Sequence, residues 1–198
     1  YLPQDCMGTS YVFAGHDDNI LLVKNDASDY YVPQYGVETL TEMCPGEAYA
    51  VFLSGASDLS FTYPAPMSSS DDLADLGRTM EDYKARAHNN VFDNTGESYL
   101  IVIENVVGAA PKKGDQIKAY ADDTLIGSIN IVQEHLDKTH AIDLVIVSSV
   151  DLSIYGGPVL PGYEDGDNIK LRYYSEGQEE SVIFKSTSMV SNGELALN

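Results

Sequence analysis

The residues best suited to chemistry form an acidic loop late in the chain. Asp165, Asp167 and Asn168 place three oxygen-bearing side chains within four residues. Calcium takes several oxygen ligands from short, flexible segments, so these residues are a candidate calcium site. They do not form the twelve-residue helix–loop–helix pattern, and the Gly-Asp pair inside the loop suits a turn that opens a strand equally well. We therefore expect no cofactor, and calcium is the alternative that the sequence offers.

Catalytic motifs are missing from the sequence. His135 and His140 lie five residues apart, a spacing that suits neither one face of a helix nor one face of a strand. No serine nucleophile elbow and no phosphate-binding loop is found. We therefore expect a protein that is not an enzyme.

Cys6 and Cys44 are the only cysteines. They could be free thiols, unrelated buried residues or a disulfide. In an exported protein, a bridge between them would staple the first quarter of the chain. Two cysteines without a histidine cluster make a poor zinc site.

Tyrosines offer a candidate ligand-binding face. The chain holds 14 Tyr and no Trp, and Tyr30, Tyr31 and Tyr35 lie close to Asp29 and Gln34. Exposed rings beside acids and amides bind sugars by stacking and hydrogen bonding. The alternative is strand alternation, in which one of two adjacent rings points inward and the other outward.

The net charge of the chain limits the kinds of partner that it can bind. The formal net charge is −20 and the pI is near 4.2. Such a chain repels phosphate backbones and anionic lipids, so we expect no nucleic-acid partner. Solubility alone also explains this acidity. No run of 18 apolar residues is present, so we expect no membrane insertion. The chain opens with Tyr1 and shows no signal peptide, and we interpret it as a trimmed piece of a longer protein.

The elements that must position these residues are mostly strands. Residues 1–64 predict a small β module, with a helical turn at 39–43. Its strands are predicted at 11–14, 20–24, 30–32, 48–53 and 59–63, with Gly-, Asn- and Asp-rich turns between them. Residues 65–90 predict a linker and a short helix, because a Pro- and Ser-rich stretch precedes apolar residues at helical spacing.

Residues 91–187 predict a β-sandwich module. Its strands are predicted at 99–107, 116–121, 125–132, 141–150, 168–174 and 181–185. The segment Gly114–Lys118 resembles Gly166–Lys170, and each leads into a strand that bears Tyr. Residues 188–198 predict a flexible tail. The fold class is therefore all-β and sandwich-like, with two small β modules and a short helix in the linker.

Both modules resemble a known kind of protein. The stretches 20–26, 30–37 and 40–53 are similar to a repeat of large secreted proteins in Bacteroidota and other environmental bacteria. The stretches 114–120 and 161–174 are similar to a β-sandwich that often accompanies this repeat. The resemblance implies large modular surface proteins used for adhesion, matrix or substrate handling, and similar modules on virions. It implies no catalytic residue.

We therefore expect a non-catalytic structural or adhesive module, located outside the cell, on the cell surface or on a virion. Its partners would be neighbouring protein chains in an assembly. The alternative is a carbohydrate-binding module that holds glycans with the tyrosines named above, and an enzyme is the least favoured class.

Overall fold

The fold is all-β, as the sequence predicts. The computed structural model describes residues 6–55, 58–64, 95, 97–138, 140–188 and 196–197. The chain divides into two compact units, Tyr1–Ala87 and His88–Asn198, and each is described by itself. In the described residues, no helix has the length and apolar character needed to cross a membrane.

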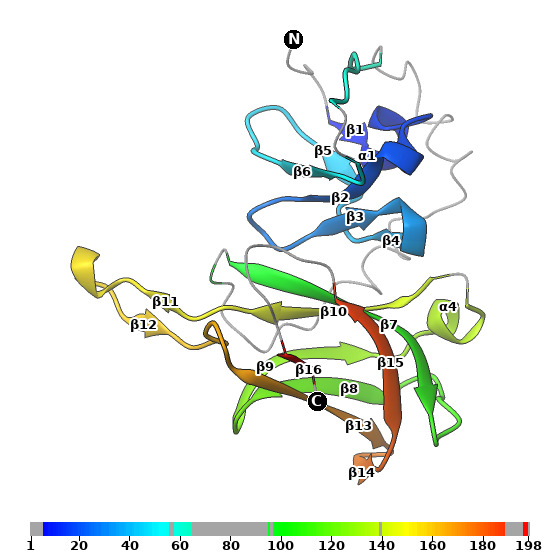
Figure 1. The fold of residues 1–198 in the computed structure, drawn as a ribbon, viewed down its shortest axis with the longest axis vertical. Helices are drawn as coiled ribbons and strands as arrows, with labels where there is room; N and C mark the ends of the chain where they lie inside the picture. Colours follow the sequence, from blue (N-terminus) through cyan, green and yellow to red (C-terminus); the bar gives the residue numbers. More distant parts are fainter. Residues whose placement is uncertain are drawn as a thin grey trace. The chain divides into compact units, whose positions relative to one another are not determined.

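The first unit is built on a four-stranded antiparallel sheet in the order β4-β3-β2-β6, with a separate antiparallel pair of β1 and β5 (Figure 1). Its elements are β1 (Met7–Gly8), α1 (Thr9–Val12), β2 (Ile20–Lys24), β3 (Tyr30–Val32), β4 (Val37–Glu38), β5 (Glu42–Met43) and β6 (Ala50–Leu53), with short 3₁₀ helices at Asp17–Asn19 and Pro33–Tyr35.

Aromatic side chains form much of the core of the first unit. Phe13 is fully buried, and its ring stacks on Tyr31 with centroids 6.2 Å apart and lies 5.2 Å from the ring of Phe61. Leu59 and Tyr63 pack against the same core. The strand predicted at 59–63 is wrong: this segment contributes apolar side chains without strand pairing.

Two further predictions for the first unit are wrong. The strand expected at 11–14 is instead the end of α1, where the Phe13 N–H donates to the Thr9 carbonyl (3.1 Å) and directs the ring into the core. The helical turn expected at 39–43 is instead strand β5, because Met43 pairs with Met7. In both places tertiary packing outweighs the local preference.

The second unit contains two sheets. One has the order β10-β7-β15 and the other has β14-β13-β8-β9, with β16 added in parallel to β13. Their strands are β7 (Ser98–Val107), β8 (Gln116–Ala121), β9 (Thr124–Asn130), β10 (Ile142–Val147), β13 (Asn168–Ser175), β14 (Gln178–Glu180), β15 (Ile183–Ser188) and β16 (Ala196–Leu197). A short helix, α4 (Gln133–Leu136), follows β9, and the pair β11 (Val150–Asp151) and β12 (Val159–Leu160) lies between β10 and β13.

One hydrophobic core joins the two sheets of the second unit, which makes it a sandwich. The core takes residues from β7 and β10 of the first sheet and from β8, β9 and β13 of the second. In β8 the burial alternates, so Ile117 and Ala119 face inward while Lys118 and Tyr120 face outward. On the outer face, Lys118 lies 4.8 Å from the ring centre of Tyr174. This cation–π contact stabilises the solvent-facing side of the sheet.

The predicted strands of the second unit agree with the structure to within a few residues. The exception is 141–150, which the structure divides into β10 and the start of β11. Part of the predicted flexible tail is in strands, since Ser188 ends β15 and Ala196–Leu197 form β16. The predicted linker and its helix lie outside the described residues.

Candidate functional site

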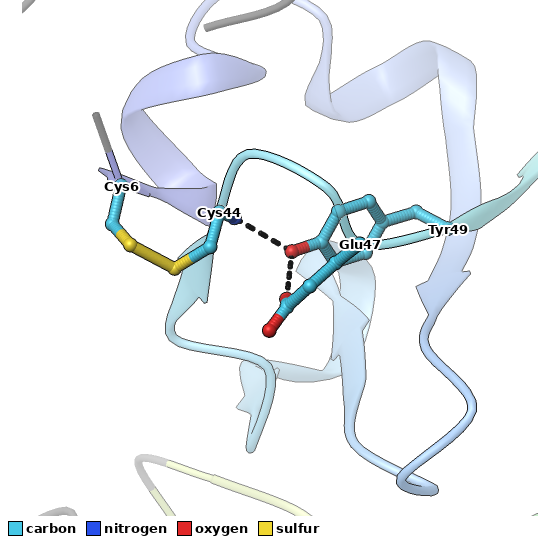
Figure 2. Close-up of a disulfide and its surroundings, with 4 residues drawn as sticks. All are labelled: Cys6, Cys44, Glu47 and Tyr49. Carbon is cyan, nitrogen blue, oxygen red and sulfur yellow. Dashed lines mark hydrogen bonds between the residues drawn. A yellow bond between two sulfur atoms is a disulfide. The ribbon is translucent and has the colours of Figure 1, made fainter. Parts of the chain in front are cut away.

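Cys6 and Cys44 form a disulfide, one of the alternatives open from the sequence (Figure 2). The bond links the residue before β1 to the residue after β5. Next to it, the Tyr49 hydroxyl accepts a hydrogen bond from the Cys44 N–H (2.7 Å) and donates one to Glu47. Burial and the Glu47 carboxylate raise the pKa of Tyr49 to about 12. A tyrosine hydroxyl is protonated at neutral pH, so it can donate to Glu47 there.

A metal ion does not suit this corner in its oxidised form. Glu42 lies close to both sulfur atoms and completes a group of three atoms with metal-binding spacing. Zinc is bound by thiolates, however, and the sulfurs of a disulfide carry no such charge. The group is therefore a structural corner.

The candidate calcium loop forms a turn that is closed by its own hydrogen bonds. The Glu164 N–H donates to Asp167 Oδ2 (2.8 Å), and the Asp167 N–H donates to the Glu164 carbonyl (3.0 Å). Asp165 is exposed, and Asn168 is the first residue of β13. One carboxylate oxygen of Asp167 thus already accepts a hydrogen bond from a backbone N–H. Calcium binding by this loop stays a prediction.

The tyrosine face predicted from the sequence is wrong. Tyr30 is 1% exposed and Tyr31 is 5% exposed, so neither ring is available for stacking on a sugar. All of β3 is buried, which means that both faces of this strand are covered. The alternation of one ring in and one out is therefore wrong as well. The Tyr31 hydroxyl donates to Asp17 Oδ1 (2.8 Å), and Tyr35 is half-buried in a 3₁₀ helix.

The His135 side chain is largely buried, and both of its ring nitrogens face a partner. Nδ1 accepts a hydrogen bond from the Val132 N–H (3.3 Å), which closes the first turn of α4. Nε2 lies 3.4 Å from Asp143 Oδ1 on β10. This arrangement holds the ring in place and ties α4 to the sheet, and it engages both nitrogens that could move a proton.

Beside this pair lies a cavity of about 230 Å³. Its walls come from β7, from α4 and from the start of β10. Apolar side chains make up more than half of the lining: Ile103, Val106, Pro111, Ile131, Leu136, Ala141 and Ile142. Lys138, Glu104 and Asn105 add exposed polar groups. The cavity is therefore an apolar pocket with a polar rim.

A second feature of this unit is an arm, residues 148–162, that contains β11 and β12. Figure 1 shows it in yellow, extending away from the sandwich. Its base is anchored by Tyr163, which is 7% exposed and belongs to the sandwich core. The Ser149 N–H donates to the Tyr163 carbonyl (2.8 Å), and the Tyr163 N–H donates to the Val147 carbonyl (2.9 Å).

Turn hydrogen bonds and one close backbone crossing hold the arm in its shape. At its base, a Cβ on Gly162 would lie 2.2 Å from the Ser148 carbonyl carbon, so only glycine fits this crossing. At its tip, the Ser153 N–H donates to Asp151 Oδ1 (2.8 Å). Gly156 takes a left-handed conformation with φ of 77° and closes the turn.

The tip of the arm presents large apolar side chains to solvent. Ile154 is 80% exposed, Tyr155 is 82% exposed and Val159 is 59% exposed. Exposed apolar groups that cluster on an ordered projection are typical of contact sites. Sequence reasoning missed this site. The signal was a turn segment around Gly156-Gly157 that carries Ile and Tyr where turns usually carry charged or polar residues.

Protein-family models, curated proteins and solved structures contain no match to this chain.

Proposed function

We propose that this chain is a non-catalytic structural module of an extracellular or surface assembly, and that its arm contacts a neighbouring protein chain. The observation that carries the proposal is the exposure of Ile154 and Tyr155 on a turn that is closed by its own backbone hydrogen bonds. Burying two such side chains contributes about 3 to 6 kcal/mol before the costs of association. Because the tip is preorganised, little of this is lost to ordering the arm on binding.

Other features support the same proposal. A disulfide between Cys6 and Cys44 suits an oxidising compartment, such as the cell exterior. The resemblance to modules of large secreted surface proteins points to the same location. A glycan-binding role loses its argument, because Tyr30 and Tyr31 are buried.

Site-specific photo-cross-linking tests the proposal. A photoreactive phenylalanine analogue is placed at Tyr155 in the full chain, and the protein is irradiated with the surface and secreted proteins of the producing cells. We expect a defined protein adduct from this position. The matched control carries the same analogue at Ile183, which is 69% exposed but lies on β15.

An adduct from position 155 and none from position 183 would support contact through the arm. If position 155 formed no adduct with any protein, including the chain itself, the proposal would be wrong. The double variant Ile154→Ser/Tyr155→Ser should keep the thermal midpoint of the wild type, because both side chains are exposed. A large drop in that midpoint would show that the tip stabilises the fold instead of a contact.

A further inference from the structure

We propose that the arm binds a second copy of this chain, in the cavity between α4 and the β7–β10 sheet, so that copies join head to tail. This inference rests on the proposed function, in which the arm contacts a protein chain. It adds the identity of the partner and the place where the tip binds.

The size of the cavity favours a side chain as its occupant. Pockets for drug-sized ligands usually enclose about 300–1,000 Å³. This cavity measures about 230 Å³, which is below that range. Its apolar walls, which include Leu136 and Ile142, suit an aromatic ring or a branched aliphatic side chain better than a charged metabolite. Tyr155 and Ile154 at the tip of the arm are groups of this kind.

Charge explains why the arm can approach an acidic copy of itself. The chain carries −20 overall, so most pairs of its surfaces repel. Within residues 148–162, however, Asp151 is the only charged residue. The cavity lining carries one exposed base, Lys138, and one exposed acid, Glu104, so its formal charges cancel and it does not add to the repulsion of an incoming arm. The contact therefore joins a stretch with a single charged residue to a cavity lining without net formal charge.

The positions of the arm and the cavity on the second unit determine the symmetry of the contact. The arm and α4 lie on opposite sides of the second unit (Figure 1), so one copy cannot fill its own cavity with its own arm. Two different surfaces meet in such a contact, which makes it heterologous. Each copy then offers a free arm at one end and a free cavity at the other. Heterologous contacts of this type build rings or filaments.

The experiment is a complementation test by light scattering on the full chain. The arm variant is Ile154→Ser/Tyr155→Ser, and the cavity variant is Ala141→Trp, which fills the cavity from the loop before β10. Asn105→Trp is a second cavity variant, on an exposed position of β7. Measurements are made at low salt and at about 1 M salt, where the Debye length falls to about 3 Å.

We expect the wild-type mass to rise with concentration beyond that of a dimer, and to rise further at high salt. Each variant alone should associate at least about 30-fold more weakly, as expected for loss of a hot spot. An equimolar mixture of the arm and cavity variants should form a dimer and nothing larger, because it retains one intact arm and one intact cavity. The control Ile183→Ser, at an apolar and exposed site on β15, should assemble like the wild type.

Several outcomes would overturn the inference. A wild type that stays monomeric at every concentration and salt would do so, and an adduct with a different protein at position 155 would then leave the proposed function standing. Cavity variants that assemble like the wild type would show that the arm binds elsewhere. A mixture of variants that stays monomeric would contradict head-to-tail joining. If Ala141→Trp does not unfold cooperatively, Asn105→Trp decides.

Discussion

Two turns in the second unit share a Gly-Asp pair and a backbone conformation but differ in their surroundings. The first, Lys112–Asp115, opens β8, and the second, Glu164–Asp167, opens β13. In each, the Asp carboxylate accepts the N–H of the residue three positions earlier at 2.8 Å. In each, the glycine before the Asp takes a left-handed conformation, with φ of 96° at Gly114 and 94° at Gly166.

The difference lies on the neighbouring strand. Asp115 is 4% exposed, and its carboxylate also accepts hydrogen bonds from the Tyr173 hydroxyl and from the Ser175 hydroxyl (3.0 Å). Because β8 and β13 run antiparallel, the start of β8 lies beside the end of β13, where these hydroxyls are. Asp167 precedes the start of β13, which lies beside the end of β8 and the Asp122-Asp123 turn that follows it. Its side chain is partly exposed. The Asp115 side chain is therefore buried in a hydrogen-bond network, while the Asp167 side chain closes a turn at the surface.

The comparison is tested most strongly by removing the buried carboxylate. Asp115→Ala leaves three donors without their acceptor, of which the Tyr173 hydroxyl is fully buried. We expect a loss of about 3 kcal/mol or more in the free energy of unfolding, measured by urea denaturation. A loss no greater than that for Asp167→Ala would show that the two turns are energetically alike.

The charge of Asp115 makes part of this contribution depend on pH. Burial by itself raises the pKa of Asp115, but the hydrogen bonds from Tyr173, the Lys112 backbone and Ser175 outweigh it and lower the pKa. Because the pKa of Asp115 is lower in the folded state, its carboxylate stabilises the fold fully at a pH above the unfolded-state pKa of about 3.9. This stabilisation is lost as the pH falls through the folded-state pKa. The stability advantage of the wild type over Asp115→Asn should therefore shrink on acidification below about pH 4. An advantage that stays constant down to about pH 2 would contradict the ionised carboxylate.

The Tyr173 hydroxyl tests one bond of the network. Tyr173→Phe keeps the ring in the core and removes the donor to an ionised group, so we expect a loss of about 2 kcal/mol in the free energy of unfolding. Tyr174→Phe is the matched control, because the Tyr174 hydroxyl meets Glu179 at 3.3 Å in an exposed setting. Equal effects of the two substitutions would rule out a special role for the buried hydroxyl.

The smallest effect is expected at the surface turn. Asp167→Ala removes one hydrogen bond to the Glu164 N–H, which water can replace, so we expect a loss of about 1 kcal/mol or less. The same urea series measures it. A loss as large as that at Asp115 would mean that the Asp165–Asn168 loop holds something more than its own turn. Calcium would be the first ligand to test there, by repeating the series with the ion and with a chelator.

Much of the fold could be predicted from the sequence, because strand signals are local. The alternating pattern of Gln-Ile-Lys-Ala-Tyr-Ala in 116–121 predicts β8 with its observed bounds, and the Gly-Asp pairs predict the turns before β8 and β13. Predictions failed in the first unit, at 11–14, 39–43 and 59–63. There the decisive interactions are packing around Phe13 and pairing of Met43 with Met7, which link residues distant in sequence.

The candidate site could not be predicted in the same way, because it depends on exposure. A Tyr in a strand and a Tyr in a turn have the same chemistry in the sequence, yet Tyr31 is 5% exposed and Tyr155 is 82% exposed. What covers β3, and what leaves the arm uncovered, follows from how whole elements pack.

The sequence by itself determined the all-β class, the turns and the acidity, since each follows from residue types within a few positions. The tertiary structure decided the rest. It placed Cys6 beside Cys44, made Asp115 part of a buried network and left Asp167 at the surface. It also placed the arm and the cavity on opposite sides of one sandwich (Figure 1). The physical reason is that burial and pairing depend on residues far apart in the chain, which only the folded arrangement brings together.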